Sequence, residues 1–444
     1  MKSIEQWLNK HNISDVECLV ADMAGMTRGK LIRVNDFIGE SPKLSEGMLL
    51  QTITGNYCDE HDDFVSPEDS DMLLTAVPKS IRLVPWAKRA TAQVIHDCYT
   101  PEGEPHYLSS RNVLKSVLAE YKALGLKAVI APEVEFYLIE KNSDSSKALT
   151  SPLGASGRST SIKQPLGMDA LYEFESFINT LYEYCDQQEL AVGTLSHESG
   201  TAQMEINFNH GDPLDLADQV FMFKRTLKHA ALKQGMYATF MAKPMADQPG
   251  SSMHIHQSLI DLESGTNAFC TATGDKTDTF MHYLAGLQKY TPKLISFYAP
   301  NVNSYRRFTN YLNAPSNLCW GYDNRTVAFR VPDSKPEATR IENRFSGIDS
   351  NPYLAIAASL ASGLAGIKNK LSPTAPFKGC VDNAEVKIAT SLEKALDNLM
   401  DMGDFGTIIS AEFIHAYRSV KLNELAEYNS VITAWERENL LSNV

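Results

Sequence analysis

Four segments with the composition of β-strands each carry two polar or ionisable side chains at a spacing of two residues. The pairs are Glu133 with Glu135, Gln203 with Glu205, His254 with His256, and Glu342 with Arg344. Residues i and i+2 of a strand point to the same face of a sheet, so the two members of each pair share a face. A further carboxylate, Glu198, lies just before the second pair. The surrounding residues are apolar, and buried carboxylates must be paired with cations or bind a metal.

These residue types predict a hard divalent cation and phosphoryl transfer. Five carboxylates and a histidine suit Mg²⁺ or Mn²⁺ better than zinc, which prefers histidine and cysteine. Guanidinium groups hold phosphate and carboxylate through paired hydrogen bonds. They are frequent in one stretch of the chain, at Arg306, Arg307, Arg325, Arg330, Arg340 and Arg344. Because the sequence has no GxxxxGK(S/T) loop, we expect metal and arginine to hold the phosphates.

The strands that must position these side chains follow a smaller group of strands at the start of the chain. Strand patterns occur there at residues 16–21, 30–34, 72–77 and 91–95, and the first two flank a turn-rich DMAGMTRG that predicts a β-hairpin. A segment rich in Pro, Glu and Gly follows and is typical of a boundary. We therefore predict a small N-terminal domain at residues 1–107 and a second domain at residues 108–444.

Helices and strands alternate in the second domain. Helices are expected after Ser109 or Ser110, after a capping Asp169, and from residue 213 to 234, where Gly235 ends the helix. Strands are expected at residues 129–140, 203–209, 237–243, 253–259, 326–331 and 339–345, the last two forming a hairpin around PDSKPE. The expected fold class is α+β, with a large antiparallel sheet that carries the chemistry.

Composition narrows the class of protein. The formal net charge of −13 argues against a nucleic-acid partner, whose binding needs a basic surface. Seven scattered cysteines without CxxC spacing indicate reduced thiols in a cytoplasmic protein. The first residues are polar and charged, unlike a signal peptide. Residues 352–364 are apolar but too short to span a membrane, and predict a buried helix starting at Asn351-Pro352.

Seven sequence blocks carry a resemblance to a known family. The segments PEVEFYL, HESGTAQMEIN, TFMAKP, GSSMHIHQS, PNVNSYRRF, DNRTVAFRVP and RIENRF resemble, in order and spacing, the signature blocks of the glutamine synthetase family. The resemblance covers nearly the whole chain. It implies a β-grasp N-terminal domain, a catalytic domain with a curved antiparallel sheet flanked by helices, and a dodecamer of two hexameric rings. Each active site would lie between neighbouring subunits.

The resemblance also implies roles for individual residues. Glu135, Glu198 and Glu205 would bind the metal nearer glutamate, and Glu133, His254 and Glu342 the metal on the ATP phosphates. Arg307 would hold the glutamate α-carboxylate, with the backbone of Gly250 nearby. Arg325, Arg330, Arg344 and His256 would act on the phosphates during catalysis, and Ser258, Arg330 and Arg340 would lie on the nucleotide side. The alternative for His256 is a hydrogen-bonded core histidine, and Arg306 is expected to be structural.

Two departures from the family pattern concern ammonium. The glutamate that follows the family's arginine by six residues is replaced by Asn313, and the loop MLLQTITGNY at residues 48–57 has no carboxylate. Ammonium needs negative charge to bind it and a base to take its proton. The pattern is that of γ-glutamyl-amine ligases, among them γ-glutamylputrescine and γ-glutamylspermine synthetases. Asp59 and Glu60, with the nearby Asp62 and Asp63, are candidates for binding a distal ammonium group; a solvated acidic loop is the alternative.

The expected function is ATP-dependent ligation of glutamate to an amine through γ-glutamyl phosphate. The expected cofactors are ATP and Mg²⁺ or Mn²⁺, and the expected amine is a polyamine such as putrescine, spermidine or spermine, with a short monoamine as the variant. No nucleic-acid or membrane partner is expected. Two alternatives stay open, namely glutamine synthesis from ammonia and a non-catalytic structural relative.

Overall fold

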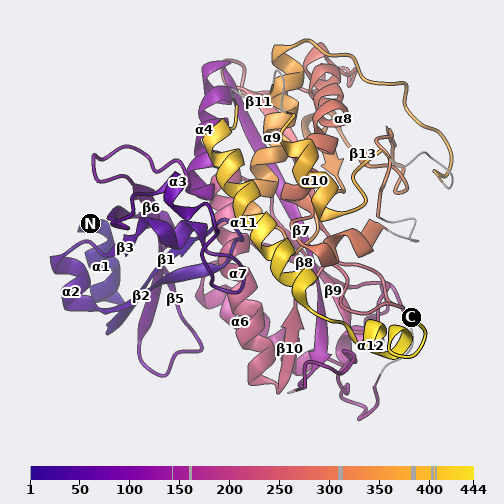
Figure 1. Cartoon of the computed structure of the whole chain (residues 1–444). Helices are drawn as coiled ribbons and strands as arrows, with labels where there is room; N and C mark the ends of the chain where they lie inside the picture. The colour runs from indigo at the N-terminus through magenta and orange to yellow at the C-terminus, as the bar shows by residue number, and fades with distance from the viewer. Residues whose placement is uncertain are drawn as a thin grey trace.

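The computed structural model describes residues 2–142, 144–159, 163–308, 314–381, 387–401, 405 and 408–444. Its backbone forms two sheets, one from the first hundred residues and one from the rest of the chain (Figure 1). Asn313 lies outside the described residues, as do residues 382–386.

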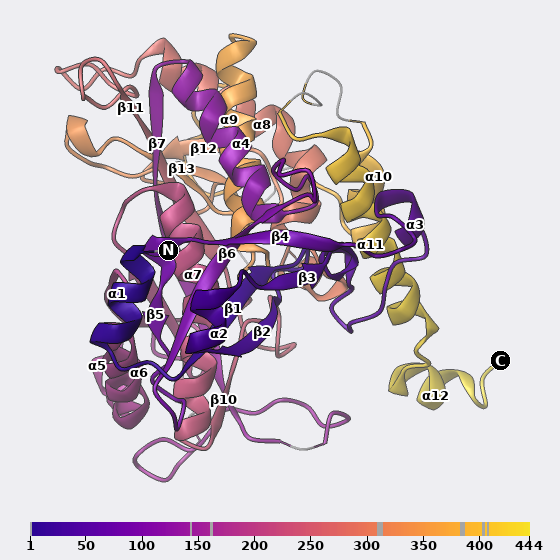
Figure 2. The same ribbon diagram turned by 90° about the vertical axis from the view of Figure 1, so that its left-hand side faces the viewer.

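The first sheet is built from the N-terminal strands, with helix α1 (Lys2–Lys10) beside them (Figure 2). Its strand order is β2-β1-β6-β4-β3, with β5 paired to β6, and the β1–β6 pair is parallel. The strands are β1 (Asp15–Ala21), β2 (Thr27–Arg33), β3 (Lys43–Ser45), β4 (Asp71–Ala76), β5 (Arg82–Leu83) and β6 (Thr91–Tyr99). The helices of this part are α2 (Val34–Gly39), η1 (Glu46–Leu50), α3 (His61–Phe64) and η2 (Pro78–Ser80).

The second sheet carries the polar pairs. Its strand order is β12-β13-β14-β11-β7-β9-β8, with β10 also paired to β7. The strands are β7 (Leu126–Glu140), β8 (Val192–His197), β9 (Gln203–Phe208), β10 (Met236–Thr239), β11 (Met253–Asp261), β12 (Trp320–Tyr322), β13 (Phe329–Val331) and β14 (Ile341–Asn343). Every pair is antiparallel except β12 with β13, so the expected antiparallel sheet has one parallel edge.

Helices pack beside this sheet and hold it in place. The helices are α4 (Ser110–Ala123), α5 (Met168–Tyr172), α6 (Glu175–Gln187), α7 (Pro213–Lys233), α8 (Asp278–Tyr298), η3 (Val302–Phe308), η4 (Pro336–Ala338), α9 (Pro352–Lys368), α10 (Leu392–Leu399), α11 (Ala411–Ser430) and α12 (Ala434–Leu440). α4 and α7 pack against β7, and α9 lies between them and α8. Among the described residues, none of the helices is long and apolar enough to cross a membrane.

α9 shows how the sequence produces this layer. Asn351 caps the helix by accepting a hydrogen bond from the Tyr353 backbone N–H, and Pro352 occupies its first turn, as the sequence predicted. The residues from Pro352 to Gly366 are buried on all sides, which explains why this stretch is mostly apolar and carries no charged side chain. The Asn351 side chain also donates to the backbone carbonyls of Asp22 and Met23, so it joins the start of α9 to the N-terminal sheet.

Most expected elements are confirmed, and one needs correction. The β1–β2 and β13–β14 hairpins form as predicted. The single helix expected after Asp169 is instead two helices, α5 and α6, and Asp169 lies inside the first of them. Where the first helix ends, the carbonyl of Glu173 accepts a hydrogen bond from the Ala155 backbone N–H, which belongs to an earlier loop of the chain.

Candidate active site

The registers of the second sheet bring the polar pairs together. β11 pairs with β7 so that His254 faces Glu133, and β9 pairs with β7 so that Glu205 faces Glu135. β14 pairs with β11 so that Glu342 faces His256. Directly opposed residues of an antiparallel pair lie close enough for their side chains to touch. Four strands therefore contribute to one polar cluster in an otherwise apolar sheet.

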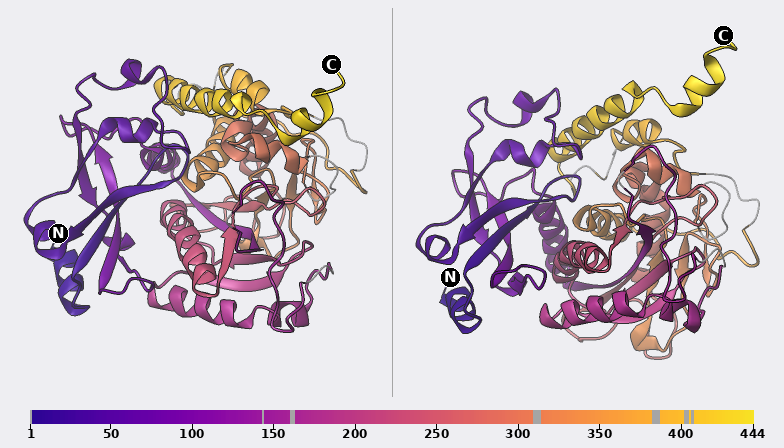
Figure 3. Two further views of the ribbon diagram at one scale, coloured as in Figure 1. Left: turned by 60° about the horizontal axis from the view of Figure 1, so that its bottom comes forward. Right: turned by 90° about the horizontal axis from the view of Figure 1, so that it is seen from below.

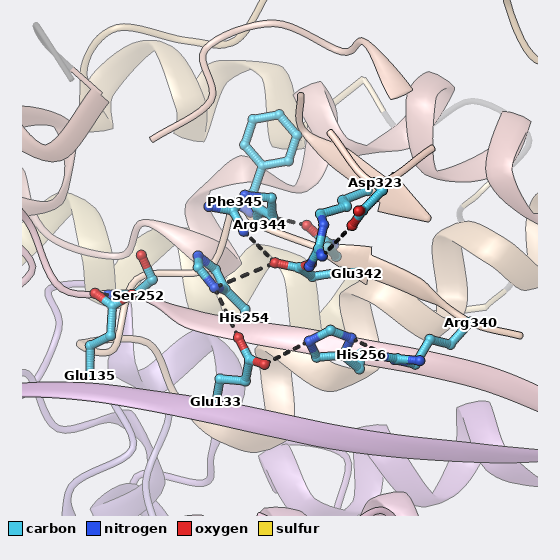
Figure 4. Close-up of polar contacts among 12 residues, drawn as sticks. Glu133, Glu135, Ser252, His254, His256, Asp323, Arg340, Glu342, Arg344 and Phe345 are labelled. Atoms are coloured by element: carbon cyan, nitrogen blue, oxygen red, sulfur yellow. Dashed lines mark hydrogen bonds and ion pairs between the residues drawn. The ribbon is translucent and has the colours of Figure 1, made fainter. Parts of the chain in front are cut away.

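Glu133 lies at the centre of this cluster. Nε2 of His256 donates to one of its carboxylate oxygens at 2.9 Å, and Nδ1 of His254 lies 3.3 Å from the other (Figure 4). Nε of Arg340 donates to Nδ1 of His256 at 3.1 Å, which fixes the ring with its proton on Nε2. His256 is therefore held between an arginine and a carboxylate.

Glu342 is the second centre. It is almost completely buried, and it accepts hydrogen bonds from Arg344 and, at 2.8 Å, from Nη1 of Arg330. His254 lies 3.6 Å from the same carboxylate. Although burial alone would raise the pKa of Glu342, the Arg344 charge and the two histidines lower it to about 2. Glu342 is therefore an anion at every pH at which the protein is expected to work.

Two sets of side chains have the spacing of a metal site. The possible ligand atoms of Glu133, His256 and Glu342 lie within 4.8 Å of one another, and so do those of Glu133, Glu205 and His254. Nε2 of His254 is buried and has no hydrogen-bond partner among the described residues. An unpartnered imidazole nitrogen among carboxylates fits a divalent cation with mixed oxygen and nitrogen ligands.

The remaining carboxylates, Glu135, Glu198 and Glu205, lie close together, and nearby positive charge does not fully offset their mutual repulsion and burial. Burial, followed by the charge of Glu198, raises the pKa of Glu135 to about 8. Burial, followed by the charges of Glu133 and Glu135, raises the pKa of Glu205 to about 9. Burial also raises the pKa of Glu198. A bound cation would remove this repulsion, so the electrostatics of the cluster fit the metal that the sequence predicts.

Arg307 and Gly250 are adjacent, as the sequence predicted. Arg307 is fully buried, and its guanidinium group donates to the backbone carbonyls of Phe345 and Arg344 at 2.7 and 2.8 Å. Burial lowers its pKa to about 10. A side chain at residue 250 would have its Cβ 2.6 Å from Cγ of Arg307. Glycine is therefore needed for the arginine to occupy this position.

A large cavity lies beside the cluster. Its volume is about 940 Å³, within the size range of nucleotide and cofactor sites. His256, Ser258 and Arg340 line it, together with apolar and polar residues such as Ile130 and Cys270. The hydroxyl of Ser258 donates to the Thr339 carbonyl at 2.9 Å and fixes one wall. The predicted nucleotide-side residues thus share one cavity, except Arg330, which does not line it.

The other predicted residues are more dispersed. Arg325 is exposed, and its charge lowers the pKa of Glu198 against the effect of burial. Asp59 and Glu60 are exposed and lie against α11 of the same chain, where Asp59 N–H donates to Asn423 at 2.7 Å and Glu60 lies 3.6 Å from His415. Within the described ranges, neither Asp59 nor Glu60 forms a hydrogen bond or ion pair with the carboxylate cluster.

Two residues of the site were missed by sequence reasoning. The Ser252 backbone N–H donates to Glu135 at 2.8 Å, and its hydroxyl accepts from Arg307 at 3.3 Å. The same spacing of two that singles out His254 and His256 extends back to Ser252, so this residue could have been found. Asp323, which accepts from Arg330 at 2.6 Å, follows no such pattern in the sequence.

Comparison with known proteins gives consistent matches over the chain. Residues 107–440 match the model of the glutamine synthetase catalytic domain. A glutamate–isopropylamine ligase of Pseudomonas sp. is 33% identical over 451 residues, covering 98% of this chain and 96% of the relative. The γ-glutamylputrescine synthetase PuuA of Escherichia coli K12 is 31% identical over 455 residues, covering 100% of this chain and 95% of the relative. The solved structure of apo GmaS without ligand superposes with a TM-score of 0.85 at 27% identity, covering all of both chains.

Proposed function

The chain belongs to the glutamine synthetase family, and from this premise we propose that it is an ATP-dependent ligase that joins the γ-carboxylate of glutamate to a primary amine. The observation that carries the proposal is the carboxylate and histidine cluster beside the large cavity lined by His256, Ser258 and Arg340. A nucleotide in that cavity would present its phosphates to the cluster.

The proposed reaction has two steps. An oxygen of the glutamate γ-carboxylate attacks the terminal phosphorus of ATP, and ADP leaves. The amine nitrogen then attacks the acyl carbon, the C–O bond breaks, and phosphate leaves, while the nitrogen loses a proton. Divalent ions, Mg²⁺ or Mn²⁺, would supply charge neutralisation at the phosphates, held by Glu133, Glu135, Glu198, Glu205, His254 and Glu342.

The chain's own residues orient the reactants in this scheme. Arg307 would hold the glutamate α-carboxylate, because a buried guanidinium beside Gly250 is a strong carboxylate partner. Arg325, Arg330 and Arg344 would stabilise charge on the transferring phosphoryl group. His256, fixed by Arg340, would donate from Nε2 toward that group when Glu133 binds a cation.

The amine is proposed to be a primary alkylamine, with a polyamine such as putrescine, spermidine or spermine as the first candidate. The relative PuuA is named for putrescine and supports this choice. The glutamate–isopropylamine ligase favours a short monoamine as the second candidate. The test is phosphate release and product mass with ATP, Mg²⁺, glutamate and a panel of isopropylamine, putrescine, spermidine, spermine and ammonium. Turnover with ammonium alone would contradict the proposal and favour glutamine synthesis, and no turnover with any amine would favour a non-catalytic relative.

We also propose that the protein works in the cytoplasm as a dodecamer of two hexameric rings. The end of the chain supports an assembly, because α12 projects away from the body of the subunit, beyond the part of α11 that packs against it (Figure 3). Ile432, Trp435 and Leu441 on this extension are 66%, 66% and 84% exposed. Large apolar side chains gathered on one extension favour burial against another subunit.

A further inference from the structure

A second cavity lies between the N-terminal sheet and the catalytic part of the chain. Its volume is about 640 Å³, which suits a small organic molecule. Its walls come from residues 24–27 and Ile53 on one side and from α7, η3 and α11 on the other. None of the residues assigned above to glutamate, nucleotide or metal lines it. The cavity is therefore separate from the candidate active site.

Two lysines of α7 place positive charge in this cavity. Lys224 and Lys228 are one helical turn apart and share a face. Both ammonium groups lie 5.7 Å from the centroid of the Phe240 ring. Lys224 donates to the backbone carbonyls of Ile348 and Ser350 at 2.5 and 2.9 Å, which leaves one of its three N–H groups for another acceptor.

No carboxylate neutralises either lysine at short range. Within the described ranges of the chain, neither ammonium group forms an ion pair, although Asp349 lies near enough to raise the pKa of Lys224. Burial outweighs that effect and lowers the pKa of Lys224 to about 7. Lys224 is half-buried and Lys228 is exposed. Asp349 and Glu424 also line the cavity, but Glu424 is paired with Lys421 at 2.7 Å, so the two lysines leave positive charge that an anion can pair with.

The rest of the wall is largely apolar. It includes Phe221, Phe240, Met241, Val302 and Leu392. A fully hydrated inorganic ion would leave this surface unused, whereas an anion with an apolar body would cover it while placing its charge on the lysines.

The cavity is connected to the proposed glutamate site through η3. Asn301 and Ser304, at the start of η3, both donate to one oxygen of Asp349, at 2.8 and 2.6 Å. Asn303 exchanges two hydrogen bonds of 2.9 Å with the backbone of Lys243. Asn301, Asn303 and Asp349 line the cavity, and Arg307 lies near the other end of the same short helix.

We propose that this cavity is a second ligand site for a small organic anion, one that bears a carboxylate or phosphate group on an apolar body and whose binding changes the affinity for glutamate. The change in glutamate affinity rests on the proposed function, since it assumes that Arg307 binds glutamate. The binding itself does not.

Calorimetry on the full chain tests the binding without any enzyme assay. The probes are phenyl phosphate and benzoate, which distinguish phosphate from carboxylate, and inorganic phosphate, which lacks the apolar body. We expect at least one aromatic probe to bind more tightly than inorganic phosphate. Lys228→Gln should weaken that binding about tenfold, because it removes one of the two charges. The matched control is Lys233→Gln on the same helix, whose exposed ammonium lies over Tyr184 outside the cavity.

The possible results separate the two parts of the proposal. Absence of binding by both aromatic probes, or equal binding by wild type and Lys228→Gln, would overturn the ligand site. Initial rates at varied glutamate, with and without the bound probe, test the connection. A probe-dependent change in the KM for glutamate that disappears in Lys228→Gln would support it, and an unchanged KM would overturn it. An inactive enzyme that still binds the probe would contradict the proposed function and leave the ligand site standing.

Discussion

Glu205 is a single residue that shows how electrostatic repulsion builds up in the carboxylate cluster. It lies opposite Glu135 across two strands, and burial together with the neighbouring carboxylates raises its pKa to about 9. Such a carboxylate favours binding of a cation but lowers the stability of the metal-free protein, since the neighbouring carboxylates repel it until a cation is bound. Strain of this electrostatic type is expected at functional sites and unexpected in a purely structural relative.

The first prediction is that Glu205→Gln abolishes turnover while stabilising the metal-free protein. The amide removes a charged ligand, so activity at saturating Mg²⁺ should fall by about 100-fold or more. It also removes repulsion, so the melting temperature in chelator at about pH 9 should rise. The control is the exposed Glu263→Gln. Near wild-type activity in Glu205→Gln would remove this residue from the metal site.

The second prediction concerns pH. Glu135 and Glu205 have folded-state pKa values of about 8 and about 9, above the ordinary glutamate value. The unfolded chain therefore releases these two protons at a lower pH than the folded protein does. The metal-free protein loses stability as pH rises from the ordinary glutamate pKa to the folded-state values of about 8 and about 9. Bound metal replaces the protons. Mg²⁺ should consequently raise the melting temperature more at about pH 9 than at about pH 7, as scanning calorimetry can measure, and an equal rise at both would contradict the metal assignment.

The third prediction concerns the glutamate side. Gly250→Ala would place a Cβ 2.6 Å from Cγ of Arg307 and 2.8 Å from the Ala242 carbonyl, so the arginine must move. We expect the KM for glutamate to rise about tenfold or more, with a smaller effect on the KM for ATP. Arg307→Lys should act in the same direction, because it replaces a planar fork with a point charge. A glutamate KM unchanged in both variants would exclude Arg307 from the glutamate site.

At the scale of elements, the strands were predictable and their partners were not. A spacing of two residues identifies the ionisable pairs on β7, β9, β11 and β14, because strand geometry alone makes them share a face. Nothing in that pattern gives the register that sets Glu205 opposite Glu135, since register depends on packing between segments far apart in the chain. The break between α5 and α6 was also missed, and the donor to the Glu173 carbonyl at that break, Ala155, lies in an earlier loop of the chain.

The loop at residues 48–57 illustrates a related limit. The sequence shows that it has no carboxylate of its own. In the structure the loop contacts two carboxylates of α11. The Ile53 N–H donates to Glu424 and the Thr54 hydroxyl donates to Glu427, each at 2.8 Å. Negative charge is thus present beside this loop, from a helix more than 360 residues away in sequence.

The fourth prediction concerns the acidic run after that loop. If part of this run binds the distal ammonium of a polyamine, Asp59→Asn or Glu60→Gln should raise the KM for putrescine about tenfold and leave that for isopropylamine nearly unchanged. The exposed Glu40→Gln serves as the control. Small and equal effects on both amines would assign the run to solvent, in agreement with the exposure of Asp59, Glu60, Asp62 and Asp63 in the single chain.

At the scale of the whole molecule, the C-terminal extension bears on assembly. The family resemblance implies a dodecamer, and the exposed Ile432, Trp435 and Leu441 supply a surface that a neighbouring subunit could cover. The fold of one subunit was predictable from sequence blocks, whereas contacts between subunits leave no comparable periodic pattern in the chain. The domain boundary at residue 107 likewise stays a prediction.

The fifth prediction follows from that extension. Deleting residues 432–444 should lower the mass measured by light scattering from that of a dodecamer of 49.2 kDa chains to that of a smaller ring or monomer. The matched control is Trp435→Phe, which keeps the apolar character. An unchanged mass after deletion would show that other surfaces hold the assembly together.

The placement of β7 in the middle of its sheet has a consequence for synthesis on the ribosome. Glu133 emerges more than 200 residues before Glu342, and its strand partners β9, β10 and β11 follow at long intervals. At about 5–20 residues per second, roughly 10–40 s pass between the first and last carboxylate of the cluster. During that time β7 is a nascent strand with charged residues and no finished sheet. We expect the same carboxylates that later repel each other to keep this early strand soluble, because unpaired edges that carry charge resist pairing with other chains.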